Sequence, residues 1–118
     1  MLNEITTISM LYDFYGNLLP ERQKEFLRLY REENFSLSEI AQEFGLSRQG
    51  VYDGVKKAEA ALYTYEEKLK LLERFQRTEQ VLKSIDQSID LLISEAGINS
   101  ELAEKLLIIK NIADTLGE

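Results

Sequence analysis

Apolar side chains recur along most of the chain at steps of three and four residues, which places them on one face of an α-helix. This spacing predicts five helical segments, which cover residues 3–15, 20–33, 37–44, 48–96 and 101–116. Only one proline and six glycines interrupt the chain, and such scarcity favours long helices over many turns. The predicted fold class is therefore all-α.

Capping residues mark several of the predicted helix ends. Ser36 and Glu39 have the Ser-x-x-Glu spacing of a capping box, in which each side chain bonds a backbone N–H at the start of the helix. Gly45 is predicted to end that helix, because glycine adopts the left-handed conformation of a helix terminus without steric cost. Ser47 is then predicted to cap the next helix, and Asn34 to end the preceding one in a left-handed conformation.

The two helices around Gly45 are predicted to form a helix-turn-helix over residues 36–59. Such a motif needs a short scaffold helix, a tight turn and a second helix that crosses the first at a steep angle. Ala41 is small where the helices would cross, and Leu46 would fill the corner of the turn. The apolar positions that would join the two helices are Leu37, Ile40, Ala41, Leu46, Val51 and Val55.

If Val51 and Val55 face inward, the opposite face of the second helix is exposed. Arginine and glutamine near the N-terminus of a recognition helix can make bidentate contacts to guanine and adenine edges. Serine and the neighbouring backbone N–H groups can hold a phosphate, and lysines further along add phosphate contacts. The residues predicted to bind nucleic acid in these ways are Ser47, Arg48, Gln49, Tyr52, Lys56 and Lys57.

A second interpretation of this face is an ordinary solvated helix, in which the two lysines pair with Asp53 and Glu59. Asp53 would also repel a phosphate from the exposed face. Gly50 and Gly54 each lower helix stability by roughly 1 kcal/mol relative to alanine, which indicates close packing or local flexibility. The sequence leaves both interpretations open.

The chain carries 14 basic and 21 acidic residues, a net charge of −7 at pH 7. This acidity counts against strong non-specific DNA binding, which depends on a basic face. Residues 48–60, with three bases and two acids, form the one locally basic segment. The absence of cysteine and histidine excludes thiol or imidazole metal sites and Cys/His or Ser/His catalysis. No carboxylate spacing marks an acid–base pair or a metal cage, so neither an enzyme nor a cofactor is predicted.

Three motifs stand out along the first half of the chain: Leu19–Gln23, Ser36–Ala41 and Gly45–Arg48. Together they resemble region 4 of bacterial sigma factors, the part that reads a promoter element. Two further motifs are Leu11–Tyr15 and Ser47–Asp53. These carry a more specific resemblance, which covers most of residues 5–75, to the YlxM family of small bacterial helix-turn-helix proteins.

The resemblance implies a sigma-region-4-like head with an added helical tail, in a bacterial cytoplasmic protein encoded near the genes of the signal recognition particle. That neighbourhood implies a role in the signal recognition particle pathway or in its regulation. DNA binding in the family is itself inferred from the fold. Gly50 stands where alanine is more usual in the family, and Gly54 where a polar residue is expected.

Helical periodicity continues beyond the motif, so a helix-turn-helix domain is predicted over residues 1–60 and a helical tail over residues 61–118. Two consecutive steps of three place a phase slip at Arg74–Thr78, where a break between two helices is predicted. Apolar residues cover more of the last helix than one contact face requires. The tail either folds back on the head or pairs with a second tail. We expect the second arrangement, a homodimer that presents two recognition helices to a duplex.

These features predict a cytoplasmic DNA-binding regulator. The N-terminal residues lack the basic and apolar regions of a secretory signal, and no apolar stretch is long enough to span a membrane. The alternative function is a protein or RNA adaptor of the signal recognition particle, whose acidic surface binds a basic partner and which reads no DNA sequence.

Overall fold

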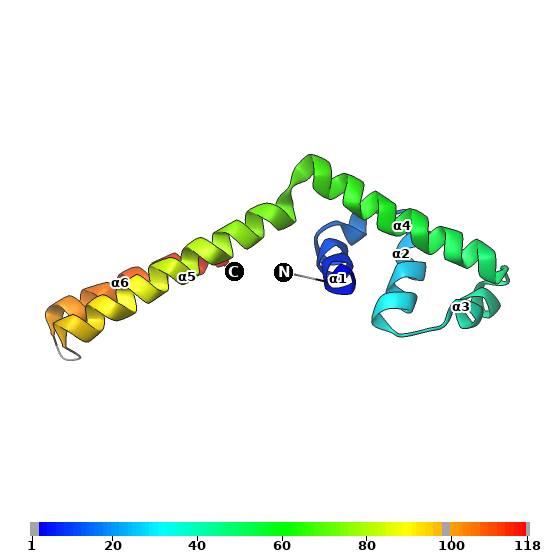
Figure 1. Ribbon diagram of the computed structural model, residues 1–118. Helices are drawn as coiled ribbons and strands as arrows, with labels where there is room; N and C mark the ends of the chain where they lie inside the picture. Colours follow the sequence, from blue (N-terminus) through cyan, green and yellow to red (C-terminus); the bar gives the residue numbers. More distant parts are fainter. Residues whose placement is uncertain (1–2, 98–99, 118) are drawn as a thin grey trace. The chain divides into compact units, whose positions relative to one another are not determined.

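The computed structural model describes residues 3–97 and 100–117 (Figure 1). Within these ranges the chain forms helices and no strand, which confirms the all-α class. The α-helices are α1 (Glu4–Tyr15), α2 (Glu21–Leu27), α3 (Leu37–Phe44), α4 (Arg48–Leu69), α5 (Leu71–Ala96) and α6 (Glu101–Asp114). Short segments follow three of them: a 3₁₀ turn at Gly16–Leu18, a π-helical turn at Arg28–Glu32 and a 3₁₀ turn at Thr115–Gly117.

The chain divides into two compact units, an N-terminal unit that ends at Leu72 and a C-terminal unit that begins at Glu73. This boundary lies later in the chain than the one expected between residues 60 and 61. The reason is that the second half of α4 and the first turn of α5 still belong to the N-terminal core. Leu62 is completely buried in that core, and Leu72 is only 5% exposed.

Helix α4 is the central element of the N-terminal unit. Its buried face contacts α1, α2 and α3, which Figure 1 shows gathered along it. The largest fully buried side chains come from all four helices: Tyr15, Ile8, Leu11, Leu27, Ile40, Leu62, Val51 and Val55. Burial of a side chain of this size contributes about 1.5–3 kcal/mol. The three shorter helices therefore hold α4 in a defined orientation.

The predicted caps of the motif are present. Ser36 Oγ accepts the N–H of Glu39 at 3.0 Å, and Glu39 Oε1 accepts the N–H of Ser36 at 3.1 Å. Gly45 ends α3 with a φ of 66°, and Asn34 has a φ of 58°, so both are left-handed. Ser47 Oγ accepts a backbone N–H from the first turn of α4 at 3.0 Å. Helix ends that depend on these local signals lie where the sequence predicts them.

The long helix predicted over residues 48–96 is broken at Lys70, where φ is 56° and ψ is 32°. The break predicted at Arg74–Thr78 is wrong, because those residues lie inside α5. No local signal marks the true position, since leucine and lysine both favour helix. Contacts with α1, far away in the sequence, accompany the break instead.

The C-terminal unit is a hairpin in which α6 runs antiparallel to α5 (Figure 1). The pairing places Lys110 opposite Asp90, with 2.9 Å between Nζ and Oδ1, and Asp114 opposite Asp86. Four buried apolar side chains line the interior of the unit: Leu82, Ile89, Ala103 and Leu106. This is a small core for a unit of its length.

The outer surface of the C-terminal unit is unusually apolar. Nine aliphatic side chains on it are 47% to 69% exposed: Val81, Leu91, Leu92, Leu102, Leu107, Ile108, Ile109, Ile112 and Leu116. Most of them belong to α6, which confirms that apolar residues on this helix exceed one contact face. Where exposed apolar side chains gather in number, they mark interaction sites in proteins.

Candidate nucleic-acid interface

The turn between α3 and α4 has the geometry of a helix-turn-helix corner. The N–H of Leu46 donates to the carbonyl of Ala41 at 2.9 Å, and the N–H of Gly45 donates to that of Gln42 at 3.4 Å. These two bonds form a Schellman motif around the left-handed glycine. Leu46 was expected to fill the corner, but 38% of its surface is exposed. The corner is therefore held by backbone bonds more than by this side chain.

Close packing against α2 fixes the buried face of the first half of α4. Val51 is fully buried and Val55 is 2% exposed. A Cβ built on Gly54 would lie 2.7 Å from Cδ2 of Phe26, so only glycine fits at that position. Phe26 in turn makes an edge-on contact with Phe44 of α3, with ring centroids 5.1 Å apart. Gly54 thus serves close packing, one of the two roles considered for it.

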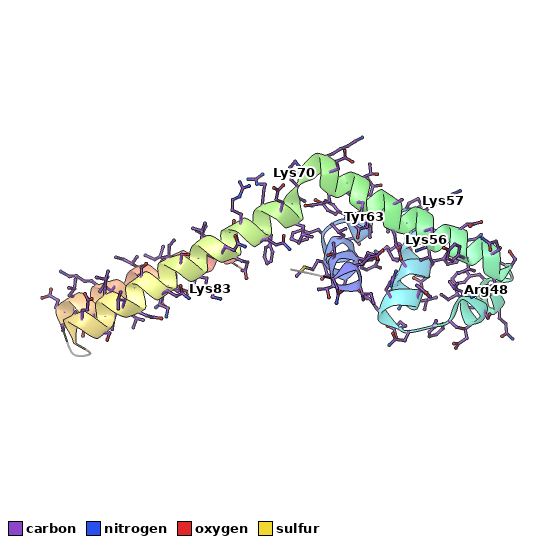
Figure 2. The ribbon with its side chains drawn as sticks, in the orientation of Figure 1. Arg48, Lys56, Lys57, Tyr63, Lys70 and Lys83 are labelled. Carbon is purple, nitrogen blue, oxygen red and sulfur yellow. The ribbon has the colours of Figure 1, made fainter. Side chains whose placement is uncertain are left out.

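The predicted nucleic-acid residues lie at the cap and along the N-terminal half of α4. Ser47 is the cap of this helix, and the remaining five are all exposed: Arg48, Gln49, Tyr52, Lys56 and Lys57. Figure 2 shows Arg48 at the end of α4 next to α3, with Lys56 and Lys57 further along the same helix. The structure therefore brings the predicted residues together on the N-terminal half of one helix.

Several of these side chains are already engaged. Gln49 Nε2 donates to Asp53 Oδ1 at 3.0 Å. Lys56 Nζ lies 3.7 Å from Glu59 Oε2 and 5.6 Å from the ring centroid of Tyr52. These contacts match part of the solvated-helix interpretation. They also hold the side chains in one arrangement.

A family profile described as "Putative helix-turn-helix protein, YlxM / p13 like" matches residues 2–101. The UPF0122 protein of Halalkalibacterium halodurans is 39% identical over 116 residues, which cover 98% of this chain and 99% of that protein. UPF0122 proteins of Bacillus cereus and Bacillus anthracis are 39% identical over 112 residues, or 95% of this chain and 99% of each relative. The chain belongs to the YlxM / p13-like family. The suspected resemblance to YlxM is thus confirmed.

The structure of this YlxM-like chain adds a pair that the sequence analysis missed. Arg31 donates two hydrogen bonds to Oε1 of Glu59, at 3.1 and 2.6 Å, although Glu59 is only 5% exposed. The sequence did contain a signal for the burial of Glu59, because this residue follows the buried Val55 by one helical turn and so lies at the edge of the buried stripe. The π-helical turn that carries Arg31 has no such signal. This pair fixes the middle of α4 to the π-helical turn that follows α2.

The C-terminal unit of the YlxM-like chain carries a second charged feature. An acidic groove of about 710 Å³ opens on it, lined among others by Glu79, Lys83, Asp86, Asp90 and Asp114. Burial of Oδ1 of Asp86, its hydrogen bond to Asp114 and repulsion between the two carboxylates raise the pKa of Asp86 above its ordinary value of 3.8. The groove therefore holds two carboxyl groups that resist ionising together.

Within residues 3–97 and 100–117, no three acidic side chains are arranged to hold a metal ion. No helix there combines the length and the apolar character needed to cross a membrane. The exposed start of α4 is the strongest candidate site.

Proposed function

We propose that this protein is a DNA-binding regulator that inserts the first turns of α4 into the major groove. The observation that carries the proposal is the rigid seating of α4. Its inner face is buried against three helices, while Arg48, Gln49 and Tyr52 point outward from its first two turns. A recognition helix needs this combination of a fixed backbone and solvent-exposed outward side chains.

The N-terminus of α4 is also suited to a phosphate. Ser47 Oγ accepts a hydrogen bond from the N–H of Gly50, and the backbone N–H of Val51 donates to the carbonyl of Ser47. The N–H groups of Arg48 and Gln49 have no partner within the helix and lie at its positive end. These amides would bind one phosphate, and Lys56 and Lys57 would contact others along the duplex.

The C-terminal unit would supply the dimer. A two-helix hairpin with four buried aliphatic side chains leaves most of its apolar surface in water. Pairing of two such hairpins into a four-helix bundle would cover that surface and present two recognition helices, as symmetric DNA-binding proteins do. The protein would act in the cytoplasm by binding rather than by catalysis.

Selection from randomised DNA duplexes, followed by affinity measurement on the selected sequence, tests the proposal. Arg48→Ala and Gln49→Ala should each lose roughly 1–3 kcal/mol of binding and relax the preference at one base position. Arg22→Ala is the matched control, because it removes the same charge from an exposed position on α2. The proposal fails if no duplex is enriched, or if all three variants bind alike.

A second candidate function is an adaptor of the signal recognition particle, and the acidic groove on the C-terminal unit favours it. In this case the purified protein or RNA of that particle should bind the chain even after Arg48 and Gln49 are replaced by alanine. Glu79→Lys, which reverses a charge in the groove, should weaken the binding of a basic protein. Binding that is lost with Arg48 and Gln49, but kept with Glu79→Lys, would count against the adaptor.

A further inference from the structure

The junction of α4 and α5 contains no residue that ends a helix by itself. No glycine or proline occurs between Gly54 and Gly97. The residues at the junction are Leu69, Lys70, Leu71 and Leu72, all good helix formers. Lys70 nevertheless adopts a φ of 56°, a left-handed conformation that is unfavourable for a residue with a Cβ (Figure 2). The break is therefore imposed by contacts from outside this segment.

Two side chains supply those contacts. The hydroxyl of Tyr15, a fully buried residue of α1, donates to Glu66 Oε1 at 2.6 Å and accepts the N–H of Leu71 at 2.9 Å. The same Glu66 oxygen accepts the N–H of Leu72 at 3.0 Å. Burial and the bond to Glu66 raise the pKa of Tyr15, so its hydroxyl stays protonated as the donor.

The two amides bound in this way are those that a continuous helix would use. In an unbroken α4–α5 helix, the N–H groups of Leu71 and Leu72 would donate to the carbonyls of Glu67 and Lys68, four residues earlier. Here the two N–H groups donate to the side chains of Tyr15 and Glu66 instead, as the first N–H groups of a new helix. Each amide thus has two alternative partners.

We propose that residues 69–72 form a two-state hinge, for which Tyr15 and Glu66 are the latch. In the latched state, which the structure shows, the hinge is broken and Leu72 is buried in the N-terminal core. In the released state α4 and α5 form one helix. The relief of the left-handed Lys70 and the helix propensity of the segment favour release. The bonds of the latch and the burial of Leu72 oppose it.

The consequence for function rests on the proposed DNA binding. Helix α4 carries the candidate DNA-binding residues at its start, and α5 continues into the C-terminal unit. In a dimer joined through the C-terminal units, the state of the hinge would set the spacing of the two recognition helices. Half-site spacing on DNA follows that distance. Release of the latch would therefore change which duplexes the dimer fits.

A distance measurement across the hinge tests the proposal without DNA. The chain has no cysteine, so two exposed sites, Ala60 and Lys83, can be replaced by cysteine and spin-labelled uniquely. A continuous helix separates their backbones by about 35 Å, at 1.5 Å per residue, and a break shortens this distance. Pulsed electron spin resonance on the full chain reports both populations.

Tyr15→Phe removes only the latch hydroxyl. It should add molecules in which α4 and α5 form one continuous helix, seen as a second peak at the longer distance. Tyr65→Phe is the matched control, because its hydroxyl donates to the carbonyl of Leu18 at 3.3 Å and not to a group of the latch. This control should leave the distance distribution of the parent chain unchanged. Equal distributions for the two variants would overturn the proposal.

A second pair of variants keeps the test decisive if Tyr15→Phe fails to fold. Lys70→Gly and Lys70→Ala lose the same side chain, but glycine tolerates the left-handed state and alanine does not. The ratio of continuous to broken chains should be about five- to thirtyfold higher for Lys70→Ala. Identical ratios would overturn the hinge, and would leave the proposed DNA binding to its own experiment.

Discussion

At the scale of single residues, the two glycines of α4 have different roles. Gly54 lets α4 approach Phe26, whose ring carbon would lie 2.7 Å from an added Cβ. Gly50 is exposed, and a Cβ there would meet only Ser47 Oγ, at 3.1 Å. The helix-propensity cost of both is similar, so the surroundings decide what each substitution does.

Gly54→Ala should therefore destabilise the N-terminal unit by roughly 1–3 kcal/mol, because Phe26 must move in a packed core. Gly50→Ala should be neutral or stabilise by up to about 1 kcal/mol. Urea denaturation followed by circular dichroism gives both free energies of unfolding. Equal stability of the two variants would contradict the packing role of Gly54.

A second prediction at the scale of single residues concerns the buried Glu59. Its carboxylate depends on two hydrogen bonds from Arg31, whose side chain is 23% exposed. Arg31→Met leaves the carboxylate without its main partner, and we expect a loss of roughly 1–3 kcal/mol. The loss is limited because Arg31 is partly solvated and Lys56 lies 3.7 Å from the other Glu59 oxygen.

The double variant Arg31→Met/Glu59→Met provides the control, because it removes the buried charge together with its partner. It should be more stable than the sum of the two single changes predicts, as residues in direct contact are. Thermal unfolding of the four proteins of this cycle measures the coupling. Additive losses would show that the pair contributes nothing specific.

At the scale of helices and turns, the sequence predicts what local chemistry determines. The ends of α3 and the start of α4 were predicted from Ser36, Gly45 and Ser47, because each cap acts within one turn of its own helix. The break at Lys70 was not predicted, because its causes are a tyrosine in α1 and the burial of Leu72. The phase slip at Arg74–Thr78 did not become a break, since α5 continues through it.

The same limit applies to the candidate site. The exposure of the candidate site residues could be predicted, because Val51 and Val55 fix which side of α4 is buried. The bond between Gln49 and Asp53 follows from their spacing of four residues. The bond of Glu59 to Arg31 could not be predicted, because Arg31 comes from a π-helical turn elsewhere in the chain.

The pairing of α5 with α6 makes a prediction about pH. The pKa of Asp86 is raised in the folded hairpin, so its contribution to stability is present below the ordinary value of 3.8. That contribution is lost as the pH rises through the raised pKa. Asp86→Asn cannot ionise, and should therefore stabilise the hairpin at pH 7 and make little difference in acid.

Amide exchange in α6, measured at pH 7 and again in acid, reports how much Asp86→Asn stabilises the hairpin under each condition. Asp90→Asn is the control, because it removes a carboxylate that pairs with Lys110 at 2.9 Å. The control should weaken the hairpin at pH 7, opposite in sign to Asp86→Asn. If both variants changed protection in the same direction, repulsion between Asp86 and Asp114 would not govern the hairpin.

At the scale of the whole molecule, the net charge and the exposed apolar surface each limit how the chain can bind a partner. The net charge of −7 weakens attraction to DNA away from the start of α4, so any DNA contact must be concentrated there. The C-terminal unit exposes nine aliphatic side chains, and large exposed apolar patches mark interaction sites. Pairing of two chains through that unit would cover the apolar side chains and would present two α4 N-termini to one duplex.

Light scattering at micromolar concentration should accordingly give twice the chain mass of 13.7 kDa. Ile112 is 65% exposed on α6, and Ile112→Glu should return the protein to a monomer because a carboxylate would be buried at the interface. Leu18→Glu introduces the same charge at a 55% exposed leucine of the N-terminal unit, and should leave the dimer intact. A monomer of the unmodified chain would refute pairing through the C-terminal unit. A monomer from both variants would place the interface elsewhere, since only one of them changes the apolar face of α6.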